Sequence, residues 1–187
     1  MLRAAMVTAV LLNTERLTLR EFSRGDLDAF HAISSDPTVA RHLAFGPTSQ
    51  KESRRLIDFA IDSQRADPRF QYALALVEQS TSELIGSCGL ALSAAQPRVA
   101  EVYFALRPTS WGRGYATEAL KAIISFGLDT LKLHRIWGQA VIANPAAALV
   151  MRKAGMSHEG MIRKAISKGG RWEDAFQYAI LESDPRE

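Results

Sequence analysis

The fold is decided by two neighbouring stretches of the chain, Glu101-Val102-Tyr103-Phe104-Ala105-Leu106 and Trp111-Gly112-Arg113-Gly114-Tyr115-Ala116. The first is a mostly apolar run of the kind that is typical of a buried strand. From Tyr115 onward, apolar residues recur at steps of three and four through residue 131, which predicts a long helix with one buried face. Pro108 lies between the two stretches, so we expect a strand, a loop and a helix in succession.

The loop before the helix is suited to an anionic ligand. Gly112 and Gly114 have no Cβ, so the main chain can approach a ligand closely. The N–H groups of the first helical turn point outward and carry the positive end of the helix dipole, which favours phosphate groups. Arg113 adds a positive charge. The sequence therefore predicts a pyrophosphate site at this helix N-terminus.

Other nucleotide-binding motifs do not fit this loop. A Gly-x-Gly sequence is weak evidence alone, because a simple turn before a helix explains it about as often. A dinucleotide-binding fold would need a third glycine and an acidic residue about twenty positions on, whereas here the helix continues to Leu131-Lys132-Leu133. A P-loop would need Gly-Lys-Ser or Gly-Lys-Thr, which the sequence lacks. What remains is a diphosphate-bearing ligand held by main-chain amides, with its remaining length along the preceding strand.

The rest of the chain alternates strand and helix patterns. Strands are predicted at residues 16–20, 72–77, 84–92, 98–106, 135–142, 157–166 and 172–181, and helices at 26–33, from 48 or 49 onward, 115–131 and 145–154. Strands that flank helices in this order predict an α/β (α+β) fold with one mixed sheet of about seven strands and helices on both faces.

Length and composition indicate a single globular domain. The chain has 187 residues, of which 47% are hydrophobic, and a net charge of +3. We expect a folded domain at residues 13–184 and a disordered or frayed extension at 1–12, which is too short in its apolar part to span a membrane. The basic residues are scattered, so nucleic acid is permitted but not indicated. Cys88 is the only cysteine, which excludes an internal disulfide and favours a reducing cytoplasm, and the four histidines are too dispersed to predict a metal site.

Five separated motifs make the chain resemble the GNAT superfamily of acetyl-CoA-dependent N-acetyltransferases, in particular its ribosomal-protein-alanine N-acetyltransferase-like branch. The motifs are Thr14-Glu15-Arg16-Leu17-Thr18-Leu19-Arg20, Trp111-Gly112-Arg113-Gly114-Tyr115-Ala116-Thr117-Glu118-Ala119, His134-Arg135-Ile136, Asn144 with Lys153-Ala154-Gly155-Met156, and Glu159-Gly160 with Gly170-x-Trp172-x-Asp174. Their order along nearly the whole chain is far more specific than any one of them.

The resemblance implies an acyl-CoA N-acyltransferase fold and acetyl-CoA as cosubstrate, without a metal. In that family the glycine loop binds the pyrophosphate, the preceding strand pairs with the pantetheine arm, and the sheet splays open to admit both substrates. The residues that inherit the cofactor role are Phe104, Ala105, Leu106, Trp111, Gly112, Arg113, Gly114, Tyr115, Ala116 and Asn144. Trp111 is expected to pack at the core or rim, and Asn144 both to cap its helix and to contact the pantetheine arm.

Acetyl transfer to an amine requires a base, because an alkylammonium has a pKa near 10. Glu101 on the strand before the loop is the first candidate, since some relatives carry their base on this strand, and a solvated Glu beside a cleft is the structural alternative. Asp174 is the second candidate and Glu159 another, each with a turn-stabilising or substrate-orienting role as the alternative. The family's usual proton donors to the thiolate are replaced by Ala147 and Met151.

The acceptor amine and the assembly state stay open. A protein N-terminal amine, a polyamine, an amino acid or an antibiotic is compatible with the sequence, and so are a monomer and a homodimer. Two other functions compete with catalysis. A non-catalytic acyl-CoA-binding module would keep the loop and lose the proton donors, and a nucleic-acid-associated protein would use the basic pI of about 9.2. No membrane partner is expected.

Overall fold

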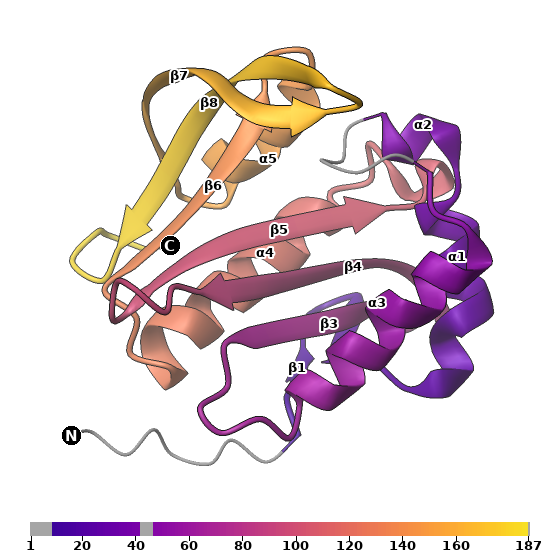
Figure 1. The fold of residues 1–187 in the computed structure, drawn as a ribbon. Helices are drawn as coiled ribbons and strands as arrows, with labels where there is room; N and C mark the ends of the chain where they lie inside the picture. Colours follow the sequence, from indigo (N-terminus) through magenta and orange to yellow (C-terminus); the bar gives the residue numbers. More distant parts are fainter. Residues whose placement is uncertain (1–8, 42–46, 187) are drawn as a thin grey trace.

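The computed structural model describes residues 9–41 and 47–186, and these form one eight-stranded sheet with helices on both faces (Figure 1). The strand order is β1-β2-β3-β4-β5-β6-β8-β7, and every neighbouring pair is antiparallel except β5 and β6. The strands are β1 (Leu11–Asn13), β2 (Leu17–Glu21), β3 (Gln71–Glu78), β4 (Glu83–Leu92), β5 (Val99–Leu106), β6 (Arg135–Val141), β7 (Ser157–Lys168) and β8 (Arg171–Leu181).

Two groups of helices cover opposite faces of the sheet. Helices α1 and α3 pack over β3 and β4, whereas α4 and α5 cover the other face (Figure 1). The helices are α1 (Leu27–Ser34), α2 (Pro37–Ala40), α3 (Gln50–Ser63), α4 (Tyr115–Ser125) and α5 (Pro145–Lys153), with 3-10 turns at Arg24–Asp26 and Pro108–Ser110 and a π-helical turn at Phe126–Thr130 after α4. The α1 and α3 side leaves the middle of β5 and β6 uncovered in Figure 1.

The sheet opens between its two parallel strands. β5 and β6 pair at three registers only, the last being Glu101 with Trp137. Beyond this point β5 continues to Leu106 and β6 to Val141 without pairing to each other. The unpaired main-chain groups along this gap are available to a ligand that carries amides of its own.

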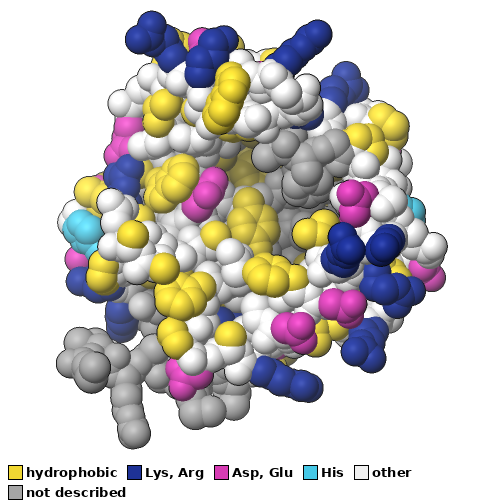
Figure 2. Space-filling view, viewed as in Figure 1, with side chains coloured by type: hydrophobic (Ala, Val, Ile, Leu, Met, Phe, Trp, Pro, Cys, Tyr) yellow, Lys and Arg dark blue, Asp and Glu magenta, His cyan; other side chains and the backbone are white. Residues whose placement is uncertain are grey.

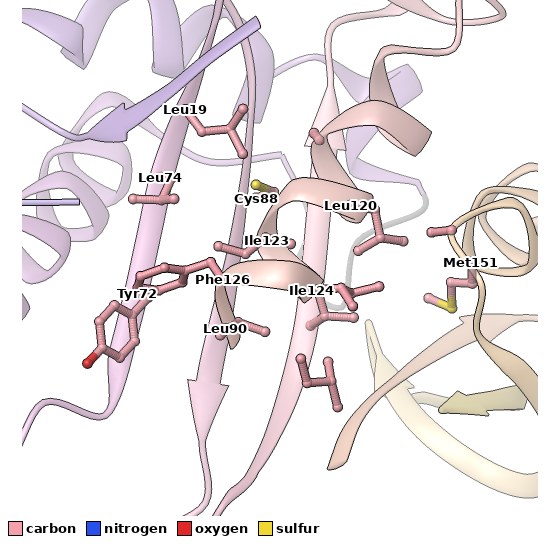
Figure 3. Close-up of a cluster of buried hydrophobic side chains, with 14 of the residues drawn as sticks. Leu19, Tyr72, Leu74, Cys88, Leu90, Leu120, Ile123, Ile124, Phe126 and Met151 are labelled. Atoms are coloured by element: carbon pink, nitrogen blue, oxygen red, sulfur yellow. The ribbon is translucent and has the colours of Figure 1, made fainter. Parts of the chain in front are cut away.

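The larger core lies between the sheet and α4 (Figure 3). Helix α4 contributes Leu120 and Ile123, which are fully buried against residues of β2, β3, β4 and β5. Cys88 lies in this core with no exposed surface, and burial raises its pKa to about 12. A thiol in this environment stays protonated and is inert as a nucleophile.

The helix boundaries follow from capping residues. Ser49 caps α3, because its hydroxyl accepts the Glu52 amide at 3.3 Å while the Glu52 carboxylate accepts the Ser49 amide at 2.7 Å. Asn144 caps α5 through an Oδ1 that accepts the Ala147 amide at 3.1 Å, as expected from the sequence. Both helix starts therefore agree with the sequence analysis.

Three features differ from the sequence-based expectations. A disordered or frayed extension was expected at residues 1–12, of which residues 1–8 lie outside the described residues. For the remaining residues the expectation is wrong, because Val10 is buried and Leu11 and Leu12 belong to β1, which pairs with β2. This strand raises the count from about seven to eight. The short helix α2 was not expected. The helical pattern through residue 131 contains a change of hydrogen bonding at its end, where the Leu131 amide donates to the Phe126 carbonyl.

Candidate active site

The glycine loop presents a row of unbonded main-chain amides at the start of α4. Gly112 and Gly114 have φ angles of +72° and +83°, a conformation that favours glycine. The Glu118 amide donates to the Gly114 carbonyl and begins the helical bonding. Among the described residues, the N–H groups of residues 112–117 have no acceptor, and residues 112–114 are exposed. This arrangement is suited to phosphate oxygens, as helix N-termini generally are.

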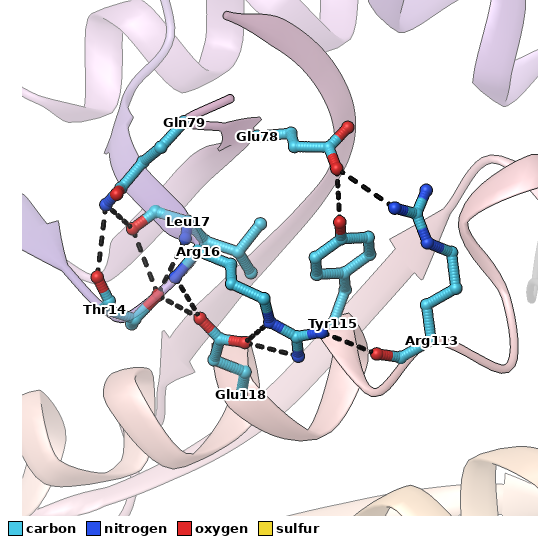
Figure 4. Close-up of polar contacts among 8 residues, drawn as sticks. All are labelled: Thr14, Arg16, Leu17, Glu78, Gln79, Arg113, Tyr115 and Glu118. Carbon is cyan, nitrogen blue, oxygen red and sulfur yellow. Dashed lines mark hydrogen bonds and ion pairs between the residues drawn. The ribbon is translucent and has the colours of Figure 1, made fainter. Parts of the chain in front are cut away.

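A carboxylate inside the first turn of α4 ties the loop to the start of β2 (Figure 4). Glu118 accepts hydrogen bonds from the Thr14 hydroxyl at 2.6 Å and from the Arg16 amide at 2.8 Å, and it pairs with the Arg16 guanidinium at 2.6 Å. Arg16 Nη1 also donates to the Arg113 carbonyl at 2.9 Å. Burial opposes ionisation of Glu118, but these hydrogen bonds outweigh it and lower the pKa of the carboxyl. The loop is thus held by a carboxylate that stays charged.

A second buried carboxylate lies behind the loop. Glu78, at the end of β3, is 5% exposed and accepts a short hydrogen bond from the Tyr115 hydroxyl (Figure 4). The Arg113 guanidinium lies 3.4 Å from the same carboxylate and 4.8 Å from the centre of the Tyr115 ring. The hydrogen bond from Tyr115 lowers the pKa of Glu78 and raises that of Tyr115. Arg113 is therefore directed toward Glu78, and its charge remains beside the loop.

The main chain of β5 alternates between β4 and the gap. The Arg107 amide donates to the Ile85 carbonyl of β4 at 2.9 Å. Because the bonding direction alternates along an antiparallel pair, Ala105 also bonds toward β4, whereas Phe104 and Leu106 direct their main-chain groups into the gap. The expected contact of Ala105 with the pantetheine arm is thus not supported by its main chain.

Trp111 lies at the rim of the gap. Its indole N–H donates to the Leu106 carbonyl at 2.8 Å, and the residue is 42% exposed. This agrees with the expected rim packing. With the Leu106 carbonyl engaged, the Leu106 amide and both main-chain groups of Phe104 remain to line the open edge of β5.

Glu101 lies where the sheet begins to open. Along a strand, side chains alternate between faces, so Glu101 and Tyr103 share the face of Ala105, which packs in the cluster under α1 and α3. In the view of Figure 2, hydrophobic side chains gather in a hollow over the middle of the sheet, with an acidic side chain among them. Burial raises the pKa of Glu101, which is the direction required of a base that works near neutral pH.

Asp174 and Glu159 have structural partners instead. Asp174 Oδ1 accepts the amide of Lys164 at 2.9 Å, where Lys164 has a φ angle of +53° in an irregular part of the β7–β8 pairing. Glu159 is paired with Arg135, with one contact of 2.6 Å, and this guanidinium lowers the pKa of Glu159 to about 2. The structure does not bring Asp174 to Glu101. The Asp174 carbonyl accepts the amide of Ile142, whereas Glu101 is paired with Trp137. These two positions are five residues apart, which is about 16 Å along an extended strand.

The β7–β8 hairpin reaches across to the helices. The Lys168 Nζ donates to the Ala40 carbonyl at the end of α2 at 2.7 Å. The hairpin and α2 therefore meet at one side of the uncovered sheet face that carries Glu101. On the opposite face, Met151 of α5 is buried in the core and Ala147 packs against the same core. Neither side chain carries a proton that it could donate.

Sequence reasoning missed three residues that shape this site, Arg16, Glu78 and Glu118. Arg16 and Glu118 occur in two of the motifs that carry the family resemblance, so a signal for them was present. Glu78 follows an apolar strand and carried no such signal. Within residues 9–41 and 47–186, no group of three or more His, Cys, Asp and Glu side chains could hold a metal ion, and no helix is long and apolar enough to cross a membrane.

A sheet that parts beside a glycine-lined helix N-terminus, with the carboxylate of Glu101 at the opening, defines the acyl-CoA N-acyltransferase class. Residues 16–157 match the family model described as the acetyltransferase (GNAT) domain. Because this match spans well over half of the chain, the protein belongs to the GNAT family. It is an acetyl-CoA-dependent N-acetyltransferase, and the predicted superfamily, fold class and cosubstrate are confirmed.

Individual relatives agree over nearly their whole lengths. The chain is 29% identical to the uncharacterized N-acetyltransferase YnaD of Bacillus subtilis, covering 92% of this chain and 98% of YnaD. It is 27% identical to the spermidine N(1)-acetyltransferase of Vibrio cholerae, covering 90% and 94%. The crystal structure of a GNAT-family acetyltransferase from Bacillus anthracis superimposes with a TM-score of 0.82 at 27% identity, covering 94% and 100%.

Proposed function

We propose that the protein acetylates a primary amine by direct attack in a ternary complex, with Glu101 as the base. Acetyl-CoA supplies the thioester. The amides of residues 112–116 hold its pyrophosphate, and the Phe104 carbonyl and the Leu106 amide bind its pantetheine arm along the gap. The observation that carries the proposal is the position of Glu101 in the last paired register before the strands part, with a raised pKa.

The chemistry of the step follows from the groups in the gap. Glu101 accepts a proton from the acceptor ammonium, and the amine nitrogen forms a bond to the acetyl carbon as the carbon–sulfur bond breaks. The Phe104 amide faces the gap and supplies a hydrogen bond to developing negative charge there. The nitrogen then loses its second proton, which water relays to the departing thiolate, since Ala147 and Met151 offer no proton, and Glu101 later releases its proton to solvent. An acetyl-enzyme on Cys88 is disfavoured by the burial and raised pKa of its thiol.

For the acceptor we propose an amine on a molecule that also carries negative charge, such as a protein N-terminus with acidic residues. Four cationic residues, Arg163, Lys164, Lys168 and Arg171, lie between positions 163 and 171 of the β7–β8 hairpin, whose Lys168 contacts α2 beside the uncovered sheet face, and only Lys164 among them has a carboxylate, Asp174, at 3.9 Å. Cations at this position repel a polyamine and attract an anion. The spermidine-acetylating relative supports a polyamine as the second candidate. The need for acetyl-CoA and the single buried cysteine support the cytoplasm as the compartment.

A panel of amines tests whether the protein transfers acetyl groups and whether it prefers a negatively charged acceptor. The purified protein is incubated with acetyl-CoA and an acidic N-terminal peptide, the same peptide with basic residues, spermidine, or a free amino acid, and thiol release and product mass are measured. We expect acetylated peptide with a kcat/KM higher for the acidic than for the basic form. Faster transfer to spermidine would overturn the acceptor class. Coenzyme binding without any acetylated amine would favour the non-catalytic binding module, and salt-sensitive RNA retention would favour the nucleic-acid-associated alternative.

A further inference from the structure

We infer that Arg16, a residue of the β1–β2 segment, is a positioning residue for the pyrophosphate site, and this inference rests on the proposed function. Arg16 lies 97 residues from Arg113 in sequence, yet its Nη1 donates to the Arg113 carbonyl at 2.9 Å. The opposite side of the guanidinium is held by Glu118, with Nε 2.7 Å and Nη2 2.6 Å from Oε2. One guanidinium therefore joins the loop to the first turn of α4 (Figure 4).

The hydrogen bond from Arg16 to the Arg113 carbonyl also fixes the direction of the Gly114 N–H, because the two groups belong to one planar peptide. In a trans peptide the carbonyl and the following N–H point in opposite directions. The peptide between Arg113 and Gly114 is trans, because Asp67-Pro68 is the only cis bond among the described residues. Because the Arg113 carbonyl points toward Arg16, the Gly114 N–H points away from Arg16, toward the exposed side of the loop. Without this bond, the carbonyl oxygen is free to rotate toward the anion site and repel phosphate.

Arg16 acts through geometry more than through its charge. Its guanidinium is already paired with Glu118, so its net field at the loop is small. The position of Arg16 is also determined independently of any ligand, because its main-chain amide bonds Glu118 at 2.8 Å and its guanidinium carbon lies 4.6 Å above the Tyr115 ring. These contacts hold the side chain against the loop before the coenzyme binds.

An acetyl donor without the diphosphate separates a role of Arg16 at the pyrophosphate site from a general loss of protein stability. CoA affinity is measured by calorimetry, and kcat/KM is measured with acetyl-CoA and with S-acetylpantetheine, which lacks the diphosphate. We expect Arg16→Ala to weaken CoA binding about tenfold, the size typical of a lost charged hydrogen bond. The same variant should leave kcat/KM for S-acetylpantetheine within about twofold of wild type. Equal losses with both donors would overturn the inference.

Arg98→Ala is the matched control. Arg98 also bonds a main-chain carbonyl, that of Lys132 at 2.7 Å, and pairs with a carboxylate, Glu182, but it lies at the start of β5, away from the loop. We expect this variant to lose similar stability and to bind CoA as wild type does. Equal CoA affinities for Arg16→Ala and Arg98→Ala would also overturn the inference.

Arg16→Lys tests geometry against charge and serves if Arg16→Ala does not fold. A single ammonium cannot hold Glu118 and the Arg113 carbonyl as the guanidinium does, so we expect weakened CoA binding despite the retained charge. Wild-type affinity in Arg16→Lys would contradict a positioning role. Absence of CoA binding by the wild-type protein would instead reject the proposed function, and the inference with it.

Discussion

Glu101 has a pKa raised by burial, and none of the ion pairs among the described residues includes it, so no cation offsets the effect of burial. Its neighbour Tyr103 also has a pKa raised by burial, although 38% of this residue is exposed, so this face of β5 is a partly desolvated environment. Desolvation disfavours the carboxylate and makes it a stronger base than an exposed glutamate. The residue is thus suited to accept a proton from an ammonium.

Replacing Glu101 by Gln should lower kcat about 100- to 10,000-fold without changing the KM for acetyl-CoA, because the base is lost and the cofactor loop is not. In the wild type, kcat should fall as pH decreases through the raised pKa of Glu101, because the base must be ionised. The pH–rate profile of the variant should lack this acid limb. An unchanged limb in Glu101→Gln would assign the titration to another group.

The same substitution should stabilise the fold near neutral pH. Burial raises the pKa of Glu101 in the folded state above its unfolded value, so its ionised form destabilises the protein at pH values above that pKa. Urea unfolding at about pH 7 should therefore give a higher midpoint for Glu101→Gln than for the wild type, with the difference vanishing below the ordinary glutamate pKa near 4.3. A lower midpoint at neutral pH would contradict the desolvated environment.

At this scale the sequence predicted single residues better than pairs. Gly112, Gly114 and Asn144 could be identified because their roles depend on local backbone geometry. Glu118 and Arg16 are 102 residues apart, and no local pattern reveals that they meet. The motif that contains Asp174 makes this residue a candidate base, whereas in the structure its carboxylate accepts the Lys164 amide.

The loop at the start of α4 is the element on which coenzyme affinity depends. Gly114→Ala should raise the KM for acetyl-CoA at least tenfold, because a Cβ is strained at a φ of +83° and relief of this strain would turn the loop amides away from the phosphates. Gly155→Ala is the control, since Gly155 ends α5 with a φ of +89° and its added Cβ would lie 3.6 Å from Ile180. Both variants should lose about 1–2 kcal/mol of stability. Equal KM values for the two variants would contradict a special role of the loop.

The β7–β8 hairpin should depend on Asp174 for its shape. Asp174→Ala removes the acceptor of the Lys164 amide, so stability should fall by about 1 kcal/mol and hydrogen exchange at Lys164 should accelerate. The acid limb of the pH–rate profile should stay where it is, while kcat/KM for the acceptor falls. A displaced acid limb in Asp174→Ala would restore this residue as a candidate base.

The elements that the sequence failed to predict are short. The strand β1 has three residues and α2 has four, and neither length allows a hydrophobic period to be recognised. The π-helical turn after α4 keeps the spacing of apolar residues near that of an α-helix. The pattern of residues 115–131 therefore cannot distinguish the π-helical turn from a continuation of α4. Long elements such as β4 and α4 were predicted because β4 is a long run of apolar and small residues and α4 repeats its helical period several times.

At the scale of the whole molecule, ion pairs predict how the protein responds to acid. Arg135 lowers the pKa of Glu159 to about 2, and the pKa of Asp26 is also lowered, where hydrogen bonds from Arg20 and Ser23 outweigh burial. A lowered folded pKa contributes stability that is present above the unfolded value and is lost as pH falls through the folded one. Unfolding free energy should therefore decline from about pH 4.5 toward pH 2. Glu159→Gln should show a shallower decline, and an equally steep one would contradict the pairing.

The central claim is that main-chain amides at the start of α4 hold the pyrophosphate of the acetyl donor, and amide NMR measures it directly. In a titration of isotope-labelled protein with CoA, the largest changes in amide proton shift should occur at residues 112–117, and pantetheine should leave these amides unchanged while shifting those of Phe104 and Leu106. Saturable CoA binding that leaves residues 112–117 unshifted would contradict the account.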